Sequence, residues 1–507
     1  MTARLDAQRR TADLAALADG AALDVLVIGG GITGAGIALD AASRGLSVAL
    51  VEKHDLAFGT SRFSSKLVHG GLRYLASGNV GIARRSAVER GILMTRTAPH
   101  LVHAMPQLVP LLGSMRRAER ALVRTGFLAG DGLRRLAGTS AAVLPRSRRI
   151  SAQRAAELAP TVRRDGLDGG LLAYDGQLID DARLVCAVAR TAAQHGAKIL
   201  TYTSASDATG TSARLTDQRT GESFDVAARA VINATGVWAA DIDPALRLRP
   251  SRGTHLVFDA AAFGNPTAAL TVPIPGELNR FVFAMPEQLG RVYLGLTDEE
   301  APGPVPEVAQ PTSAEIDFLL ATVNTALGVT LTATDVIGAY AGLRPLVDAG
   351  EGRTADVSRE HAVVASDSGV LSIIGGKLTE YRYMAQDVLD RAIALRGLRA
   401  APCRTRDLPL IGAPGNPGSD TTAAGLPASL VARYGAEAPA VLAEATCPRP
   451  GDPVADGIDV IRAEFEYAVS HEGALTVDDV VDRRTRIGLV DADRQRVVEV
   501  AGEFVAS

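Results

Sequence analysis

Apolar residues near the N-terminus change their spacing twice, which predicts a strand, a helix and a second strand. Residues 24–28 (DVLVI) form a largely apolar, β-branched run of strand length. Residues 32–44 then place apolar positions three and four apart, as in a helix packed on a sheet, and Gly45 ends that helix. Residues 46–51 are again continuously apolar, as in a strand buried on both faces. This order predicts a βαβ unit.

A different pattern, with strands of alternating character, fills residues 251–340. The strings THLVFD, LTVPI, NRFVFAMP and RVYLGLTD follow one another there, which predicts an antiparallel sheet. The apolar run at residues 99–110 is interrupted by prolines, which favours an edge or a connection over a central strand. Helices are predicted at residues 80–97, 180–195 and 378–396, and again beyond residue 428.

Glycines directly after the first predicted strand have nucleotide-binding spacing. Gly29, Gly31 and Gly34 follow the G-x-G-x-x-G pattern, and Glu52 ends the second strand 23 residues after Gly29. Gly29 permits a tight turn, Gly31 lets the backbone approach a pyrophosphate, and Gly34 lets the helix pack on the strand. The helix N-terminus favours phosphate, and Glu52 is placed to accept hydrogen bonds from an adenosine ribose. Together these features predict a dinucleotide site.

The chain after the second strand favours a flavin over a nicotinamide. Residues 53–74 are irregular, rich in hydroxyl groups and contain Gly70-Gly71, which suits the ribityl chain and pyrophosphate of FAD. Residues 231–236 (VINATG) and 373–379 (IIGGKLT) follow later flavin-domain patterns. No histidine or cysteine context requires a covalent link, so we predict noncovalent FAD. The predicted contacts are Gly29, Gly31, Ile32, Thr33, Gly34, Glu52, Thr60, Ser61, Ser64, Ser65, Lys66, Leu67, His69, Gly236, Gly376, Lys377, Leu378 and Thr379.

We predict an α/β fold (α+β overall) with a Rossmann-like FAD-binding domain, an inserted antiparallel-sheet substrate domain and a C-terminal helical domain. At 507 residues the chain exceeds one compact core. A proline- and glycine-rich stretch before the last helices predicts a linker. The predicted division is 1–21 for an N-terminal extension, 22–98, 180–250 and 341–398 for the FAD-binding domain, 99–179 and 251–340 for the substrate domain, 399–427 for the linker, and 428–507 for the helical domain.

Composition narrows the class of protein. The net charge of −4 argues against general affinity for nucleic acid. Cys186, Cys403 and Cys447 are scattered, which suits a reducing cytoplasm and predicts neither a disulfide framework nor a metal site. Residues 1–20 lack the apolar core of an export signal, and no apolar run is long enough to span a membrane. We therefore expect a cytoplasmic protein.

One basic stretch has two interpretations. Residues 116–149 contain nine arginines and two acidic residues, interleaved with apolar side chains such as Leu122 and Leu128. Most charge runs are solvated helical faces whose arginines pair with acids elsewhere. Alternatively, the stretch is an interfacial surface that lies on anionic lipid. The electron acceptor considered below gives the second interpretation its weight.

Six strings distinguish this chain from other dinucleotide-binding proteins. They are IGGGITGAGIALDAASRGLSV, SSKLVHGGLRYL, INATGVWA, GLRPL, GGKLTEYR and YAVSHEGALTVDDVVDRRTR. Together they resemble the FAD-dependent glycerol-3-phosphate dehydrogenases, the aerobic, respiratory enzymes, over residues 24–489. Arg62-Phe63 is a departure, because many relatives have two small residues there, which puts local flavin packing in doubt.

The resemblance implies oxidation of sn-glycerol 3-phosphate to dihydroxyacetone phosphate, with hydride passing to flavin N5 and electrons to a membrane quinone. A phosphate dianion requires cations in a closed site. Arg344 in GLRPL and Lys377 in GGKLT lie beside loops expected at the flavin ring. Arg73 and Tyr74 in HGGLRY form a third polar set. Each of these cations has an alternative role in a structural salt bridge.

The reaction also needs a base with a near-neutral pKa that takes the proton of the substrate hydroxyl. His255, at the start of a strand in RGTHLVF, is the first choice, although a lone histidine is more often structural. His69 is the alternative base, or a hydrogen-bond partner of the flavin. Thr379 is expected to bind the flavin or a substrate oxygen.

Three alternative functions stay open. A glycerol-3-phosphate oxidase, which reduces O₂ to hydrogen peroxide, shares the same motifs. Arg344 and Lys377 disfavour a flavin oxidoreductase of amines or other hydroxy acids, and the intact loop at Lys66 disfavours a non-catalytic flavoprotein. A quinone acceptor implies peripheral docking on the inner face of the cell membrane, with residues 116–149 contributing. The terminal helices are assigned to packing and oligomer contacts, with a homodimer as one alternative.

Overall fold

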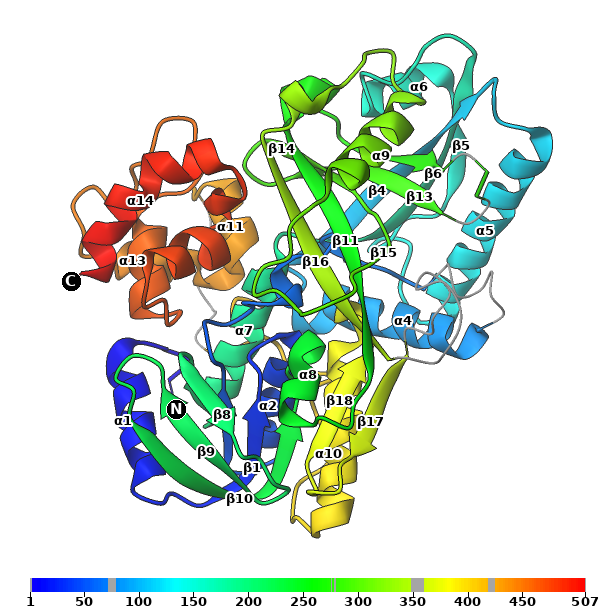
Figure 1. Ribbon diagram of the computed structural model, residues 1–507. Helices are drawn as coiled ribbons and strands as arrows, with labels where there is room; N and C mark the ends of the chain where they lie inside the picture. The colour runs from blue at the N-terminus through cyan, green and yellow to red at the C-terminus, as the bar shows by residue number, and fades with distance from the viewer. Residues whose placement is uncertain are drawn as a thin grey trace.

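The chain folds around two sheets and a helical C-terminal region, which confirms the predicted mixed α/β class. The computed structural model describes residues 2–71, 79–274, 276–277, 280–347, 360–417 and 425–506. Figure 1 shows an eight-stranded sheet at the bottom, a ten-stranded sheet above it, and the C-terminal helices at one side.

The eight-stranded sheet gathers strands from three separate stretches of the chain. Its core order is β17-β18-β10-β1-β2-β7, and β8 and β9 extend β10 as an antiparallel hairpin. The pairs from β18 through β7 are parallel, as the βαβ pattern predicts. The strands are β1 (Leu23–Ile28), β2 (Val48–Val51), β7 (Lys198–Leu200), β8 (Thr203–Ser206), β9 (Ser212–Asp217), β10 (Ser223–Asn233), β17 (His361–Ala365) and β18 (Leu371–Gly375).

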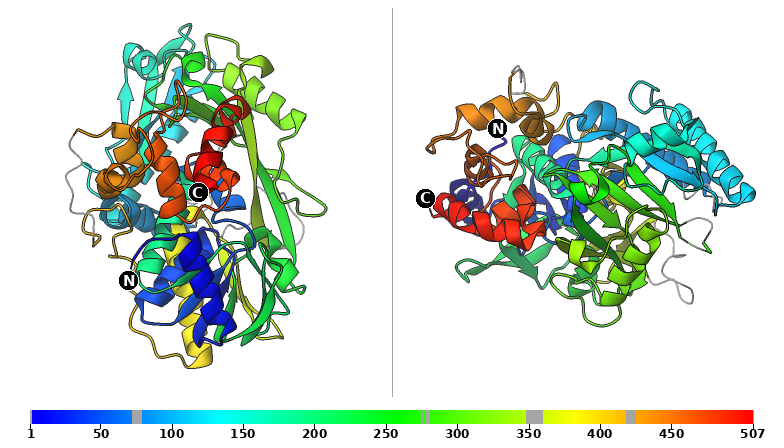
Figure 2. Two further views of the ribbon diagram at one scale, coloured as in Figure 1. Left: turned by 90° about the vertical axis from the view of Figure 1, so that its left-hand side faces the viewer. Right: turned by 90° about the horizontal axis from the view of Figure 1, so that it is seen from above.

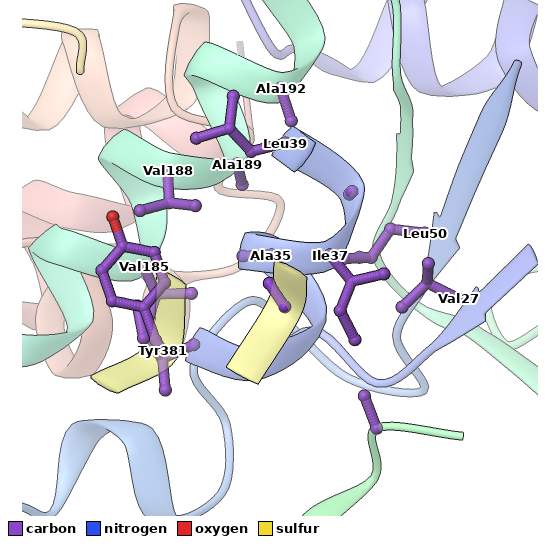
Figure 3. Close-up of a cluster of buried hydrophobic side chains, with 14 of the residues drawn as sticks. Val27, Ala35, Ile37, Leu39, Leu50, Val185, Val188, Ala189, Ala192 and Tyr381 are labelled. Atoms are coloured by element: carbon purple, nitrogen blue, oxygen red, sulfur yellow. The ribbon is translucent and has the colours of Figure 1, made fainter. Parts of the chain in front are cut away.

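Helix α2 (Ile32–Ser43) is buried between this sheet and two other helices, α7 (Asp181–Gln194) and α10 (Tyr381–Arg396). Figure 3 shows Ile37 of α2 beside Val27 and Leu50 of the sheet, with Val185 and Val188 coming from α7. Helix α1 (Ala7–Ala18) packs against β7 and β10. This packing fixes the start of α2 at the carboxyl ends of β1 and β2.

The larger sheet has the order β15-β11-β14-β13-β12-β4-β6-β3, with β16 on β11 and β5 on β6. The four alternating strings are β11 to β14, so that prediction is confirmed. Helices α6 (Ala152–Leu158) and α9 (Ser313–Asn324) contribute to the core beside it. The strands are β3 (Leu67–Val68), β4 (Val102–Leu112), β5 (Arg148–Ile150), β6 (Leu167–Leu178), β11 (Leu248–Asp259), β12 (Ala269–Pro273), β13 (Phe281–Glu287), β14 (Arg291–Gly295), β15 (Glu299–Glu300) and β16 (Gly338–Val347).

The prediction that residues 99–110 form an edge or a connection is wrong. Strand β4 lies inside the sheet, antiparallel to β6 along most of its length and parallel to β12. Its pairing with β12 covers only Gln107 and Leu108, two of the three residues between Pro106 and Pro110. Proline has no N–H for a ladder, so a short pairing lets an internal strand tolerate both rings.

The C-terminal region is helical, as predicted, and has its own apolar cores. In Figure 1 and Figure 2 its helices lie on the opposite side of the molecule from α5 (Arg117–Leu136), which follows α4 (Val80–Ile92) and the π-helix η2 (Leu93–Thr97). Among the described residues, no helix is both long enough and apolar enough to cross a membrane. The C-terminal helices are α11 (Ala428–Tyr434), α12 (Ala438–Ala443), α13 (Arg462–Ser470), the π-helix η9 (Asp479–Arg484) and α14 (Asp491–Val505).

Candidate active site

The glycine turn between β1 and α2 is crowded by backbone, as a phosphate cradle requires. Gly29 has φ +112°, and a Cβ there would lie 2.6 Å from the carbonyl oxygen of Ala234. A Cβ on Gly34 would strike the carbonyl of Gly29. Gly31 begins α2 without a side-chain cap, and Ser61 Oγ accepts from the N–H of Ile32 at 2.9 Å. The first turn of α2, which includes Thr33, therefore fits the pyrophosphate of FAD.

Glu52 lies against the same turn. Its carboxylate accepts hydrogen bonds from the N–H of Gly30 at 2.6 Å and of His54 at 2.9 Å. Burial raises the pKa of Glu52, and the two backbone donors oppose that rise. The acid is thus fixed at the end of β2, where a bound ribose would meet it.

The hydroxyl-rich segment continues from the glycine turn toward the larger sheet. Thr60, in the 3₁₀-helix η1 (Thr60–Arg62), donates to the carbonyl of Leu343 at 2.5 Å. Lys66 is buried, and its Nζ lies 2.8 Å from Asp181 Oδ2, which also accepts from the N–H of Ser64 at 2.9 Å. Lys66 thus forms a structural ion pair, and Leu67 then enters β3.

Glycines on one face of the larger sheet allow the hydroxyl-rich segment to lie close to that face. Side chains two apart on a strand share a face. A Cβ on Gly253 would strike the guanidinium of Arg344, and one on Gly342 would lie 2.9 Å from Phe63 Cβ. The absence of side chains at these two positions lets the hydroxyl-rich segment approach the sheet closely. The face consists of Ser251, Gly253 and His255 on β11, which pair with Arg344, Gly342 and Tyr340 on β16.

His255 is at the centre of that face. Its Nε2 lies 3.0 Å from Ser65 Oγ, and its ring stacks on Tyr340 with centroids 4.8 Å apart. Only 1% of its surface is exposed. Burial, followed by the nearby positive charges of Lys66 and Arg344, lowers the pKa of His255 well below its ordinary value. This pKa is lower than the near-neutral value expected of the base, but it leaves the imidazole neutral and able to accept a proton. The structure brings this predicted base together with Ser65, a predicted flavin contact.

Arg344 lies on the same face and is held by three oxygens. Its Nη1 lies 3.1 Å from Asp298 Oδ1 and 3.2 Å from Ser251 Oγ, and its Nη2 donates to the carbonyl of Thr297 at 3.1 Å. Sequence reasoning missed Asp298 and Ser251. The available signal was the acid at the end of RVYLGLTD, where a strand delivers a carboxylate to a sheet end.

Lys377 lies in the predicted glycine loop after β18, directly before the 3₁₀-helix η7 (Leu378–Glu380). Its Nζ is 3.3 Å from Glu380 Oε1 and also donates to Ser86 Oγ of α4. Burial lowers the pKa of Lys377, while Glu380 opposes the shift. Glu380 and Ser86 were missed by sequence reasoning. The adjacent Gly376 has φ +76°, and the side chain of Thr379 is buried.

The remaining predicted residues have partners other than His255 or lie outside the described part of the chain. His69 is 43% exposed, and its Nδ1 lies 3.3 Å from Asp175 Oδ2. Burial alone would raise the pKa of Asp175, but Arg90, together with His69, lowers it to about 2. Gly236, with φ +62°, turns the chain after β10. Arg73 and Tyr74 lie outside the described residues.

Comparisons with known proteins show the family to which the chain belongs. Residues 24–382 match the model of the FAD dependent oxidoreductase family, and residues 403–506 match the C-terminal domain of alpha-glycerophosphate oxidase. A glycerol-3-phosphate dehydrogenase 1 of Mycobacterium tuberculosis is 78% identical over 510 residues, covering 100% of this chain and 99% of that protein.

Solved structures give the same result. The glycerol-3-phosphate dehydrogenase of Bacillus halodurans, complexed with FAD, has a TM-score of 0.73 and 28% identity, covering 99% of this chain and 94% of that one. The L-alpha-glycerophosphate oxidase of Mycoplasma pneumoniae shares the fold, with a TM-score of 0.57 and 19% identity over 77% of this chain and 99% of that one. The chain belongs to the FAD-dependent glycerol-3-phosphate dehydrogenase family.

Proposed function

We propose that the protein oxidises sn-glycerol 3-phosphate to dihydroxyacetone phosphate with noncovalent FAD and passes the electrons to a membrane quinone. The observation that carries the proposal is that the buried His255 and the partly buried Arg344 lie on one sheet face. A neutral histidine beside a guanidinium suits a substrate that has both a hydroxyl to deprotonate and a phosphate to bind. The names of the relatives at 78% and 28% identity support the substrate.

Different residues of the site have different roles in the proposed reaction. The glycine turn at the start of α2 and the hydroxyl-rich segment would hold FAD, which would supply the hydride acceptor for the C2 hydrogen. His255 takes the proton of the C2 hydroxyl, and Ser65, whose Oγ lies 3.0 Å from Nε2, orients the imidazole. Arg344 and Lys377 bind the phosphate, each already held by an acid that fixes its direction, Asp298 for Arg344 and Glu380 for Lys377. Burial of the imidazole excludes water, which keeps it neutral until the substrate proton arrives.

Anaerobic bleaching of the flavin tests cofactor, substrate and reaction together. We expect purified yellow protein to lose its visible flavin absorbance when sn-glycerol 3-phosphate is added without oxygen. Glycerol at the same concentration should leave the absorbance unchanged, because it lacks the phosphate that Arg344 and Lys377 bind. Protein that is colourless and takes up no FAD, or yellow protein that ignores the phosphorylated substrate, contradicts the proposal.

The second part of the proposal concerns the electron acceptor, which we propose is a quinone. The alternative is a glycerol-3-phosphate oxidase that reduces O₂ to hydrogen peroxide, and the match of residues 403–506 to an oxidase C-terminal domain favours testing it. Turnover should depend on an added quinone analogue and continue under argon. Fast turnover in air without the analogue, with one peroxide released per substrate, indicates the oxidase instead.

Helix α5 supports a membrane quinone, because its solvent face is apolar. Leu122, Leu128 and Leu136 are 45%, 51% and 73% exposed. They lie six and eight positions apart, which keeps them within one broad face of the helix. Arg120 pairs with the exposed Asp168 at 2.6 Å, and Arg134 is buried.

Exposed arginines border the apolar face of α5, namely Arg116, Arg117 and Arg135. Leucines that enter lipid and arginines that meet anionic headgroups are the features of an interfacial helix. The protein is therefore assigned to the cytoplasmic side of the cell membrane, attached through α5.

A further inference from the structure

Arg486 lies where the C-terminal helical region meets both sheets. It follows η9 and precedes the 3₁₀-helix η10 (Ile487–Leu489), with φ 62°. Only 1% of its surface is exposed, and it is among the largest fully buried side chains of the described residues. A guanidinium buried this deeply requires several fixed partners.

The side chain reaches the hydroxyl-rich segment of the flavin site. Arg486 Nη2 donates to the carbonyl of Arg62 at 2.5 Å, and Lys66 Nζ donates to the same oxygen at 3.0 Å. Asp181 Oδ2 accepts from the N–H of Ser64 at 2.9 Å. The backbone is thus fixed on both sides of Phe63, directly before Ser65.

Other contacts of Arg486 extend to the rest of the molecule. Its Nε lies 3.0 Å from Asp180 Oδ2, at the start of α7, and its Nη1 donates to the carbonyl of Asp482 at 2.6 Å. Its own carbonyl accepts from Arg291 of β14 at 3.1 Å. Arg486 therefore connects three elements, namely η9, helix α7 beside the eight-stranded sheet, and strand β14 of the larger sheet.

Residues after Arg486 pack against Tyr340, the residue whose ring stacks on His255. Val490 is buried in a cluster with Tyr340 and Tyr293, and Phe63 packs against it. Tyr340 stacks on His255 and donates to the carbonyl of Ser64 at 3.1 Å. The C-terminal region thus supports both partners of the hydrogen bond between Ser65 and His255.

We propose that Arg486 is a positioning residue of the active site, which fixes residues 62–65 so that Ser65 Oγ meets His255 Nε2. The inference rests on the proposed function, because His255 is the base only if the substrate is an alcohol. It assigns the C-terminal region a role in the reaction in addition to packing. The guanidinium is essential because its three separate nitrogens, Nε, Nη1 and Nη2, reach Asp180, Asp482 and Arg62 at once, whereas a lysine has a single nitrogen for all three oxygens.

Arg486→Lys tests the inference, with Arg433→Lys as its control. Both variants keep the charge, and Arg433 is a buried arginine of the same region that bonds Glu464 at 2.6 and 2.7 Å. We expect Arg486→Lys to slow anaerobic flavin bleaching by about ten- to a hundredfold. It should also weaken FAD binding by the apoprotein about tenfold. The control should change both quantities by less than about twofold.

Two further measurements exclude a general loss of stability. If Arg486 acts through Ser65, the double variant Ser65→Ala/Arg486→Lys bleaches no more slowly than the slower single variant, whereas independent effects multiply. Arg291→Met keeps the Arg486 side chain but removes the bond to its carbonyl, and should slow bleaching in the same direction. Multiplicative effects, or a wild-type rate in either Arg486→Lys or Arg291→Met, overturn the inference.

The two proposals fail in different ways. If the wild-type flavin is not reduced by sn-glycerol 3-phosphate, the proposed function fails, while the FAD affinity and the visible circular dichroism of the flavin still test Arg486. If the wild-type flavin is reduced and Arg486→Lys matches Arg433→Lys in rate, affinity and flavin circular dichroism, the positioning role fails and the function stands.

Discussion

Ser65 Oγ lies 3.0 Å from His255 Nε2, although the two residues are 190 positions apart in the chain. Ser65 belongs to the segment that follows the FAD-binding glycine turn, and His255 to a strand of the larger sheet. Their hydrogen bond joins the cofactor side and the substrate side of the proposed site.

His255→Gln should slow flavin bleaching by sn-glycerol 3-phosphate by about a hundred- to ten-thousandfold, because the amide cannot take the hydroxyl proton. Stopped-flow absorbance without oxygen measures the rate, and the FAD content of the purified variant shows whether the site is intact. His69→Gln is the matched control, since the His69 side chain is 43% exposed and contacts Asp175. A large loss in His69→Gln with a small one in His255→Gln would reverse the assignment.

The pH dependence of bleaching follows from the lowered pKa of His255. A general base works in its neutral form, so the rate falls as the pH drops through its pKa. Since burial places that pKa well below 6.5, the rate should stay level down to pH 6.5 and fall only at more acid pH. A profile of kcat/KM against pH checks this, and a fall centred at or above 6.5 contradicts it.

Arg344→Lys should raise KM for sn-glycerol 3-phosphate by about ten- to a hundredfold, because ammonium loses the bidentate geometry that suits a phosphate. Steady-state kinetics with a quinone analogue measure the change. Arg252→Lys is the control, because Arg252 is opposite Leu343 in the register and pairs with Glu315. Equal effects of the two substitutions would remove Arg344 from the phosphate site.

Gly34→Ala should yield little or no yellow protein, because its methyl group would strike the Gly29 carbonyl and force α2 away from β1. Overpacking of this kind costs about 1–3 kcal/mol. Gly126→Ala, on α5, has no neighbour within 4 Å of the new Cβ and should be folded and yellow. The two variants are compared by FAD absorbance per protein and by the midpoint of thermal unfolding. A Gly34→Ala protein with a full complement of FAD would contradict the role of the glycine turn as a phosphate cradle.

Replacing Leu122, Leu128 and Leu136 together by Ser should abolish sedimentation with anionic vesicles, since these leucines form the exposed face of α5. Changing Arg116, Arg117 and Arg135 to Glu should also weaken sedimentation, and added salt should weaken it in the wild type. Bleaching by substrate should be unchanged in both variants, because α5 lies outside the flavin site. Undiminished sedimentation of both variants excludes α5 as the contact.

The local patterns of the sequence determined the elements and the cofactor. The G-x-G-x-x-G turn with Glu52 identified α2 and its anion-binding end, because these features depend on residues close together in the chain. Alternating strings likewise identified β11 to β14. The prolines of residues 99–110 misled the prediction, since the sequence does not show how short the pairing of β4 with β12 is.

The tertiary structure alone decided which predicted residues lie together. The sequence could not choose between His255 and His69, because a histidine's pKa depends on burial and on charges brought from distant segments. It also left the partners Asp298 and Glu380 unidentified, and it gave no sign that Arg486 reaches residue 62. Such contacts are set by the register of β11 on β16 and by the packing of the C-terminal helices, which are properties of the folded chain.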